Sequence, residues 1–198
     1  MRRRSKNADR ARAAMLSVPR ALFLPEGVRA RAAEDRPLPI GFGQTNSQPT
    51  TVANMLGQLD PRPGDRVLDV GSGSGWTAAL LAHLVGRQDL VCGVERVPEL
   101  VELARGHLAA AGFGQVTLEQ ADPEVLGMPG RAPFDKILVS AEAPSLPDLL
   151  VQQLATGGRL VIPVAGRVLV VDRFRGGKVG IRRLGNYAFV PLRWSGRG

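Results

Sequence analysis

Apolar runs of strand length alternate with helical patterns along most of this chain. Helix-favouring stretches occupy residues 8–16, 50–59, 77–84, 98–111 and 147–154. Apolar runs of strand length lie at 67–70, 90–94, 116–119, 134–140 and 159–164. Strands that alternate with helices usually form a parallel sheet covered by those helices. We therefore expect an α/β fold with a mainly parallel central sheet.

Two parts of the chain depart from this alternation. Near the end, the runs 168–174 and 178–184 flank Gly176-Gly177 and predict an antiparallel hairpin, and 188–192 favours a last strand. Residues 35–49 hold too many prolines and glycines for a regular element, and a connection this long is usually functional or disordered. The apolar residues within 35–49 indicate an ordered, packed loop.

The strand at 67–70 runs into a turn in which Gly71, Gly73 and Gly75 occupy every second position. Glycines let the backbone turn tightly and approach a ligand closely, so the turn is typical of a nucleotide-type site. A dinucleotide fingerprint requires a small residue where Trp76 stands, and the Gly-Lys-Ser/Thr of a phosphate-binding loop is missing.

Acidic residues lie at or just after the ends of three successive strands. They are Asp69, Glu95 and Asp122, and the glycine turn itself contains no basic residue. This pattern favours a cationic cofactor without phosphates, and S-adenosylmethionine fits: its carboxylate can accept backbone N–H bonds near a helix start. The alternative is that Glu95 and Asp122 are merely solvated strand ends.

Charge and composition narrow the function classes further. The net charge is +8, of which +5 falls in residues 1–12, so we expect a basic, flexible tail followed by a single domain over 13–198. The one cysteine, Cys92, lies in an apolar run and, with only His83 and His107 besides, indicates no disulfide and no metal site. No apolar run is long enough to span a membrane and no secretory signal precedes the domain, which favours the cytoplasm.

From residue 9 to residue 192 the chain resembles the protein-L-isoaspartate O-methyltransferases. The resemblance rests on the following segments: Val18-Pro19-Arg20, Phe23-Leu24-Pro25, residues 35–49 with Pro37-Leu38-Pro39-Ile40-Gly41 and Ser47-Gln48-Pro49, Asp69–Gly75, 132–135, 157–164 and Phe189-Val190-Pro191-Leu192. The stretch at 37–49 is the family's own signature and is more specific than the glycine turn.

The resemblance implies a Rossmann-like class I S-adenosylmethionine-dependent methyltransferase. It implies a substrate region over 13–60, a cofactor core over 61–164 and C-terminal strands over 165–198. Ser47 would be catalytic. Cofactor contacts would come from Gln44, Thr45, Asn46, Ser47, Asp69, Gly71, Ser72, Gly73, Glu95, Arg96, Asp122 and Pro123. Substrate contacts would come from Ile40, Thr45, Ser47 and Val190.

The implied reaction methylates the free carboxylate of an isoaspartyl residue in a protein or peptide, with S-adenosylhomocysteine as the other product. The ester then collapses to a succinimide, which hydrolyses partly to aspartate. The carboxylate is ionised at neutral pH and needs no general base. We therefore interpret Ser47 as a hydrogen-bonding group that orients the carboxylate, and we expect a monomer.

Three positions depart from the family pattern. Asn46 replaces an aliphatic residue, Pro123 replaces glycine, and Glu142 lies in an otherwise alanine-rich segment, where we expect a solvated acid rather than a substrate contact. These departures leave open an enzyme that tailors aspartate in one dedicated peptide. A nucleic-acid methyltransferase is a remote alternative, because Ser140-Ala141-Glu142-Ala143-Pro144 lacks the Asp/Asn-Pro-Pro-aromatic motif of amino methylation.

Overall fold

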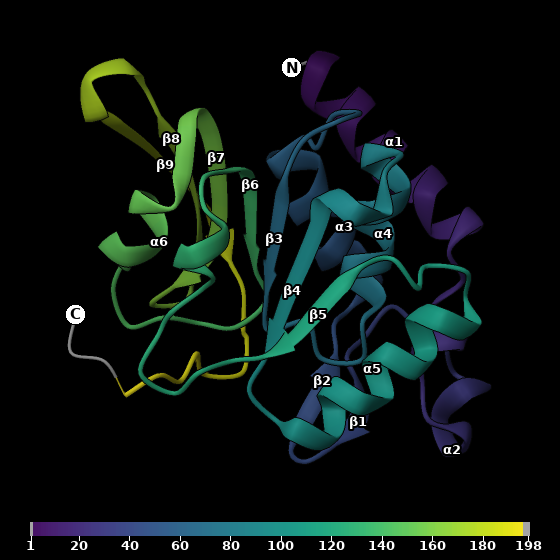
Figure 1. Cartoon of the computed structure of the whole chain (residues 1–198). Coiled ribbons are helices and arrows are strands. Elements are labelled where there is room, and N and C mark those ends of the chain that lie inside the picture. Colours follow the sequence, from purple (N-terminus) through teal and green to yellow (C-terminus); the bar gives the residue numbers. More distant parts are fainter. Residues whose placement is uncertain (1, 196–198) are drawn as a thin grey trace.

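The computed structural model describes residues 2–195, with side chains from residue 7 onward. It is a sheet covered by helices on both faces (Figure 1). The α-helices are α1 (Arg2–Ser17), α2 (Glu26–Arg29), α3 (Pro49–Leu59), α4 (Trp76–Val85), α5 (Pro98–Ala110) and α6 (Asp148–Gln152). The strands are β1 (Leu38–Gly41), β2 (Gln44–Asn46), β3 (Val67–Val70), β4 (Val91–Glu95), β5 (Thr117–Gln120), β6 (Phe134–Val139), β7 (Leu154–Val164), β8 (Arg167–Arg173) and β9 (Val179–Asn186).

Within residues 2–195 the main sheet has seven strands in the order β5-β4-β3-β6-β7-β8-β9. The strands from β5 to β7 are parallel, and β8 and β9 add to them in antiparallel fashion. The strand order reverses direction at β3, between β4 and β6. In open α/β sheets a ligand binds beyond the carboxyl ends of the strands at such a point. The fold expected from the sequence is confirmed.

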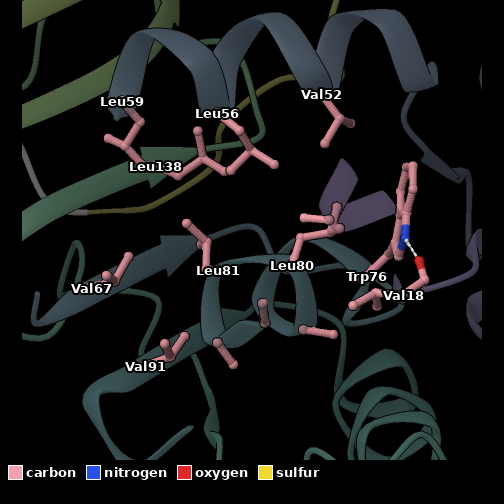
Figure 2. Packing of buried hydrophobic residues seen from close by; sticks show 14 of the residues in the cluster. Val18, Val52, Leu56, Leu59, Val67, Trp76, Leu80, Leu81, Val91 and Leu138 are labelled. Atoms are coloured by element: carbon pink, nitrogen blue, oxygen red, sulfur yellow. Dashed lines mark hydrogen bonds between the residues drawn. The ribbon is translucent and has the colours of Figure 1, made fainter. Parts of the chain in front are cut away.

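Alternate residues of each strand face the two layers of the core. Val67 of β3 belongs to the cluster formed with α1, α3, α4 and α5, whereas its neighbour Leu68 belongs to the cluster on the other face, with α6. Figure 2 shows α3 lying across α4 and Leu138. Almost every side of α4 is buried, which explains why its sequence is apolar all round.

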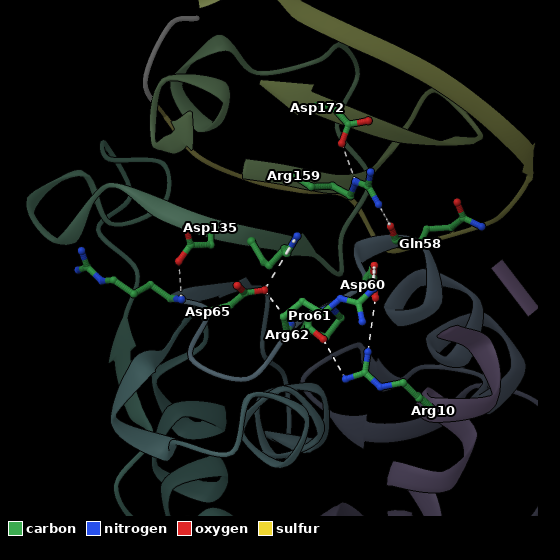
Figure 3. A network of polar contacts seen from close by, with 11 residues as sticks. Arg10, Gln58, Asp60, Pro61, Arg62, Asp65, Asp135, Arg159 and Asp172 are labelled. Atoms are coloured by element: carbon green, nitrogen blue, oxygen red, sulfur yellow. Dashed lines mark hydrogen bonds and ion pairs between the residues drawn. The ribbon is translucent and has the colours of Figure 1, made fainter. Parts of the chain in front are cut away.

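A network of polar contacts joins the ends of these elements on the amino side of the sheet (Figure 3). Asp60 forms ion pairs with Arg10 of α1 and with Arg62, at 3.4 and 2.6 Å. Arg159 of β7 donates to Asp172 of β8 at 2.6 Å, and also to the main-chain carbonyl of Gln58 at 2.9 Å. The network therefore ties α1, α3 and the antiparallel strands together away from the ligand side.

Three expectations about secondary structure are corrected. The stretch at 35–49 contains a small two-stranded sheet, β1–β2, rather than loop alone. The glycines 157–158 lie inside β7, where the pairing with β6 shifts register, so they do not follow a helix that runs to residue 154. Residues 188–192 form no strand and make only an isolated bridge between Pro191 and Glu142, because this segment crosses the strand ends instead of joining an edge.

At the other end, α1 is longer than the helix expected over 8–16 and includes the main chain of the basic segment, while the side chains of residues 2–6 lie outside those described. No helix among the described residues is long and apolar enough to cross a membrane. Across the same part of the chain, no group of three or more His, Cys, Asp or Glu side chains is arranged to hold a metal ion.

Candidate active site

The turn after β3 lies against the end of β4. Gly71 and Ser72 donate their N–H groups to the carbonyl of Val94, at 2.9 and 3.1 Å. Gly71, Gly73 and Gly75 all have positive φ angles, which glycine adopts without strain. A Cβ on Gly75 would lie 3.3 Å from Ala104 and Leu108 of α5, so glycine is also required for close packing there.

Glu95, at the end of β4, is a nearly buried carboxylate held by backbone donors. One oxygen accepts from the N–H groups of Arg96 and Val97, at 2.7 and 3.0 Å. The other accepts from the N–H of Gly73 at 3.0 Å. The acid therefore joins the ends of β3 and β4 and fixes the shape of the glycine turn.

Asp69, at the floor of the turn, is completely buried. One oxygen accepts a hydrogen bond from the Thr77 hydroxyl of α4 at 2.7 Å, and the other has no partner among the described residues. Burial raises the pKa of Asp69 to about 6, although the hydrogen bond from Thr77 acts in the opposite direction. The side chain supports the turn from below and does not line the cavity above it.

A cavity of about 240 Å³ opens above the turn. Its wall comes from β2 and Ser47, from the ends of β3, β4 and β6, and from the segments around 121–127 and 190–194. Of the residues expected to bind cofactor, ten line it: Gln44, Thr45, Asn46, Ser47, Gly71, Ser72, Gly73, Glu95, Arg96 and Asp122. Asp69 and Pro123 do not. Pro123 is exposed beyond the end of β5.

A second cavity, of about 570 Å³, lies beside the first. The two cavities share four lining residues: Thr45, Ser47, Ser140 and Val190. Ser47 therefore sits on the wall common to both. Ile40, expected to contact substrate, lines neither cavity, because it is buried with Leu38 and Leu100 in a separate small cluster.

The loop that carries Ser47 is held by Asp35. Asp35 accepts hydrogen bonds from the N–H and hydroxyl of Thr50, at 2.9 and 2.8 Å, and from the side-chain amide of Gln48 at 3.1 Å. Hydrogen bonds from Thr50 lower the pKa of Asp35. Asp35, the first residue of the stretch 35–49, thus binds the start of α3.

Glu142 is a structural residue and not the solvated acid expected from the sequence. Its side chain accepts from the N–H of Gly166 at 3.1 Å. Its main chain exchanges hydrogen bonds with Val190 and Leu192, at 2.8 and 2.7 Å. These contacts hold the segment 190–194 over the strand ends.

Trp194 lines the first cavity, although no sequence pattern pointed to it. Its indole Nε1–H is buried and has no hydrogen-bond partner among residues 2–195, and its side chain lines the first cavity. A buried donor without a partner is costly unless a ligand or water satisfies it.

The first cavity fits S-adenosylmethionine. Trp194 offers a donor without a partner. Gly71, which also lines the cavity, has a φ of 79°, and a Cβ there would come into contact with the Cβ of Ala141, another lining residue, at 3.8 Å. The wall carries two acids, Glu95 and Asp122, and two arginines, Arg96 and Arg193, a mixed charge that suits a ligand with both a cationic sulfonium and a carboxylate.

Comparison with known proteins gives consistent results. The model of the family described as protein-L-isoaspartate(D-aspartate) O-methyltransferase matches residues 1–195. A protein-L-isoaspartate O-methyltransferase from Methanopyrus kandleri is 47% identical over 189 residues, which cover 93% of this chain and 84% of that protein. One from Aeropyrum pernix is 48% identical over 183 residues, covering 90% and 70%.

Solved structures agree with the sequence relatives. A protein-L-isoaspartate O-methyltransferase from Plasmodium falciparum, crystallised with S-adenosyl-L-homocysteine, superposes with a TM-score of 0.80 at 28% identity, covering 93% of this chain and 90% of that chain. A second protein-L-isoaspartate O-methyltransferase gives a TM-score of 0.84 at 25% identity, covering 95% of this chain and 62% of the other.

Proposed function

This chain belongs to the protein-L-isoaspartate(D-aspartate) O-methyltransferase family, and from that premise we propose how its residues carry out the reaction. It is an S-adenosylmethionine-dependent methyltransferase that acts on L-isoaspartyl residues in proteins. In such a residue the main chain continues through the side-chain carbonyl, and the enzyme methylates the α-carboxylate that is left free. The observation that supports the residue roles best is the position of Ser47 on the wall shared by the two cavities.

We assign the first cavity to the cofactor. When bound, S-adenosylmethionine supplies an electrophilic methyl group on a sulfonium. Glu95 would accept hydrogen bonds from the ribose hydroxyls while keeping its bonds to the turn, and Asp122 would accept from the adenine amino group. Trp194 would donate its N–H to an acceptor of the cofactor, so that the C-terminal segment closes the cofactor cavity.

We assign the second cavity to the isoaspartyl segment of the substrate. The substrate carboxylate is ionised at neutral pH, so no residue has to remove a proton from it. The hydroxyl of Ser47 would donate to one carboxylate oxygen and point the other toward the first cavity. Holding two reactants in line in this way supplies several kcal/mol of catalysis without a nucleophile or a base.

The lining of the second cavity favours repair of varied proteins over tailoring of one peptide. It consists of uncharged residues: Pro37, Thr45, Ser47, Gln48, Thr50, Thr51, Asn54, Ser140, Asn186, Tyr187, Ala188, Phe189 and Val190. Amides, hydroxyls and aromatic rings contact peptide main chain and many side chains alike, whereas a dedicated partner usually requires complementary charge.

One assay tests this function. The protein is mixed with labelled S-adenosylmethionine and two peptides that differ only in isoaspartate against aspartate. Base-labile label on the isoaspartyl peptide alone is expected. Label on the aspartyl peptide would point to tailoring of aspartate, and label on neither peptide, with cofactor still bound, would refute the activity on generic isoaspartyl substrates.

We also propose that the chain acts as a monomer, as expected from the sequence. Light scattering after gel filtration should give a mass near 21.1 kDa. A dimeric mass would contradict this proposal. The cytoplasmic location stays a prediction from the sequence.

A further inference from the structure

Arg20 is a buried arginine whose hydrogen-bond partners are neutral oxygens. It lies in a short 3-10 helix (Arg20–Phe23), and its side chain extends into the stretch 32–47. No carboxylate in the part of the chain that the structure describes forms an ion pair with it. Its donors instead reach an amide oxygen and five main-chain carbonyls, of Asn46 (Oδ1, 2.7 Å), Ala32 (3.3 Å), Glu34 (3.0 Å), Arg36 (2.9 Å), Asn46 (2.9 Å) and Ser47 (3.0 Å).

These bonds converge on the residue proposed to orient the substrate. The Nη2 group alone donates to the carbonyls of Arg36, Asn46 and Ser47. A guanidinium presents five donors in a fixed plane, so it can hold several carbonyls at once in one relative arrangement. Strand β2 ends at Asn46, and Ser47 lies beyond it without regular pairing.

Asn46 extends this arrangement to the cofactor side. Its Oδ1 accepts from Arg20 Nε, and its Nδ2 donates to the Ser74 hydroxyl at 3.1 Å. Ser74 belongs to the glycine turn and lines the first cavity. Both polar ends of the Asn46 side chain are therefore occupied by the protein, and the amide joins the Ser47 loop to the turn.

The ring of Trp76 completes the enclosure. The Arg20 guanidinium carbon lies 5.7 Å from the ring centroid. Trp76 is itself fixed by its Nε1–H, which donates to the carbonyl of Val18 at 3.0 Å (Figure 2). A cation over an aromatic face is favourable. Trp76, the large residue that argues against a dinucleotide site, therefore packs against Arg20 and stabilises its position.

We propose that Arg20 is a positioning residue for methyl transfer, fixing the main chain at Asn46 and Ser47, and that Asn46 links this position to the cofactor turn through Ser74. The proposal rests on the function assigned to Ser47. Arg20 contacts neither cavity and acts through the loop: without it, the Ser47 hydroxyl would still be present but would no longer be held in line with the methyl donor.

The main test compares Arg20→Met and Arg20→Lys with wild type. A misplacement of about 1 Å can cost about 10²-fold in rate, so Arg20→Met should lower kcat about 100-fold. Arg20→Lys keeps the charge but not the planar fork, and should recover only part of this loss. The Kd for S-adenosylhomocysteine, measured by calorimetry, should stay within about threefold of wild type, which also shows that the variants are folded.

Arg159→Met is the matched control, because Arg159 also bonds a main-chain carbonyl, of Gln58, but on the amino side of the sheet. It should lower the melting temperature and leave kcat unchanged. Asn46→Ile removes both side-chain bonds, to Arg20 and to Ser74, while Arg20 keeps its carbonyl bonds, so kcat should fall about 30-fold, the value of two net hydrogen bonds.

Hydrogen exchange supplies a readout independent of activity. Amides of residues 43–48 should exchange faster in Arg20→Met and Arg20→Lys than in wild type and Arg159→Met, with the rest of the sheet unchanged. Wild-type kcat and wild-type exchange in a folded Arg20 variant would overturn the proposal. An inactive wild-type enzyme with the expected exchange pattern would instead refute the function assigned to Ser47 and support the positioning of the loop by Arg20.

Discussion

The two cavities of this enzyme are built in different ways. The cofactor cavity forms where parallel strands end, and its key contacts join neighbouring strand ends: Glu95 binds the N–H of Gly73, and Val94 binds Gly71 and Ser72. The substrate cavity is formed by the loop around Ser47, the first turns of α3 and a C-terminal segment with little regular pairing. Its geometry depends on side chains from distant parts of the chain that bind main-chain atoms. A regular scaffold positions the methyl donor, whereas individual polar side chains position the acceptor.

Replacing Ser47 tests the substrate side directly. Ser47→Ala should lower kcat by between about 10² and 10³, the loss typical when one oriented donor is removed from a reacting group. Cofactor affinity should hardly change. Steady-state kinetics with an isoaspartyl peptide, together with calorimetry, separates the two effects. Ser145→Ala, an exposed serine outside both cavities, is the control, and unchanged turnover in Ser47→Ala would refute its role.

Replacing Asp69, which lies below the cofactor cavity, should change how the stability of the folded protein depends on pH. Its pKa in the folded protein, about 6, lies above its unfolded value of 3.8. Its contribution to stability is therefore fully present below about pH 4 and is lost as pH rises through about 6. Asp69→Asn should remove this loss, on the order of 3 kcal/mol, in urea unfolding of the cofactor-free protein from pH 4 to 7.

Asp89→Asn is the control for that measurement. The hydrogen bond from Arg87 lowers the pKa of Asp89, so its stabilising contribution is present at neutral pH and lost as pH falls. The two variants should therefore differ from wild type with opposite slopes against pH. An Asp69→Asn profile parallel to wild type would show that Asp69 does not titrate in this range.

Replacing Glu95 tests whether its carboxylate, which is held by backbone N–H groups, is needed for cofactor binding. Glu95→Ala leaves the N–H groups of Gly73, Arg96 and Val97 without their acceptor. Bonds to a charged group are worth about 1.5–3 kcal/mol, so affinity for S-adenosylhomocysteine should fall about 30-fold. Titration calorimetry measures this. Glu119→Ala, an acid of β5 paired with Arg131, should bind as wild type.

Replacing Trp194 tests whether the C-terminal segment contributes to cofactor binding. Trp194→Phe retains a ring but removes the buried N–H. The affinity for S-adenosylhomocysteine should fall about fivefold, corresponding to one hydrogen bond of about 1 kcal/mol. The fluorescence of Trp76, which also lines the cavity, can report binding in this variant. Equal affinity in wild type and Trp194→Phe would remove Trp194 from the cofactor site.

The sequence predicted the cofactor side well because its signals are local. Apolar periodicity gave β3 to β7 and the helices between them, and residues at the strand ends necessarily meet at one edge of a parallel sheet. For this reason Glu95 and Asp122 could be placed in the cavity from their positions alone. Asp69 could not be placed there, because successive side chains of β3 point to opposite faces of the sheet and that of Asp69 points toward α4, where it binds Thr77.

The substrate side was less predictable because its contacts join remote residues. Nothing in the spacing of Arg20 indicates that it binds carbonyls up to 27 positions away, and only the family resemblance marked the Val18-Pro19-Arg20 stretch. Segment 188–192 has a strand-like composition, yet the main chain pairs with Glu142 across the strand ends. Asn46 suggested a ligand contact, but its side chain is occupied by Arg20 and Ser74.

The wall shared by the two cavities has a consequence for inhibitor design. Because Thr45, Ser47, Ser140 and Val190 border both spaces, a single compound could join an adenosyl group to a β-linked peptide by a short tether across this wall. Tethering makes the second contact intramolecular, with an effective concentration that reaches the millimolar range for short linkers. Such a bisubstrate compound should bind more tightly than either half alone, and its best linker length would measure the gap between methyl donor and acceptor.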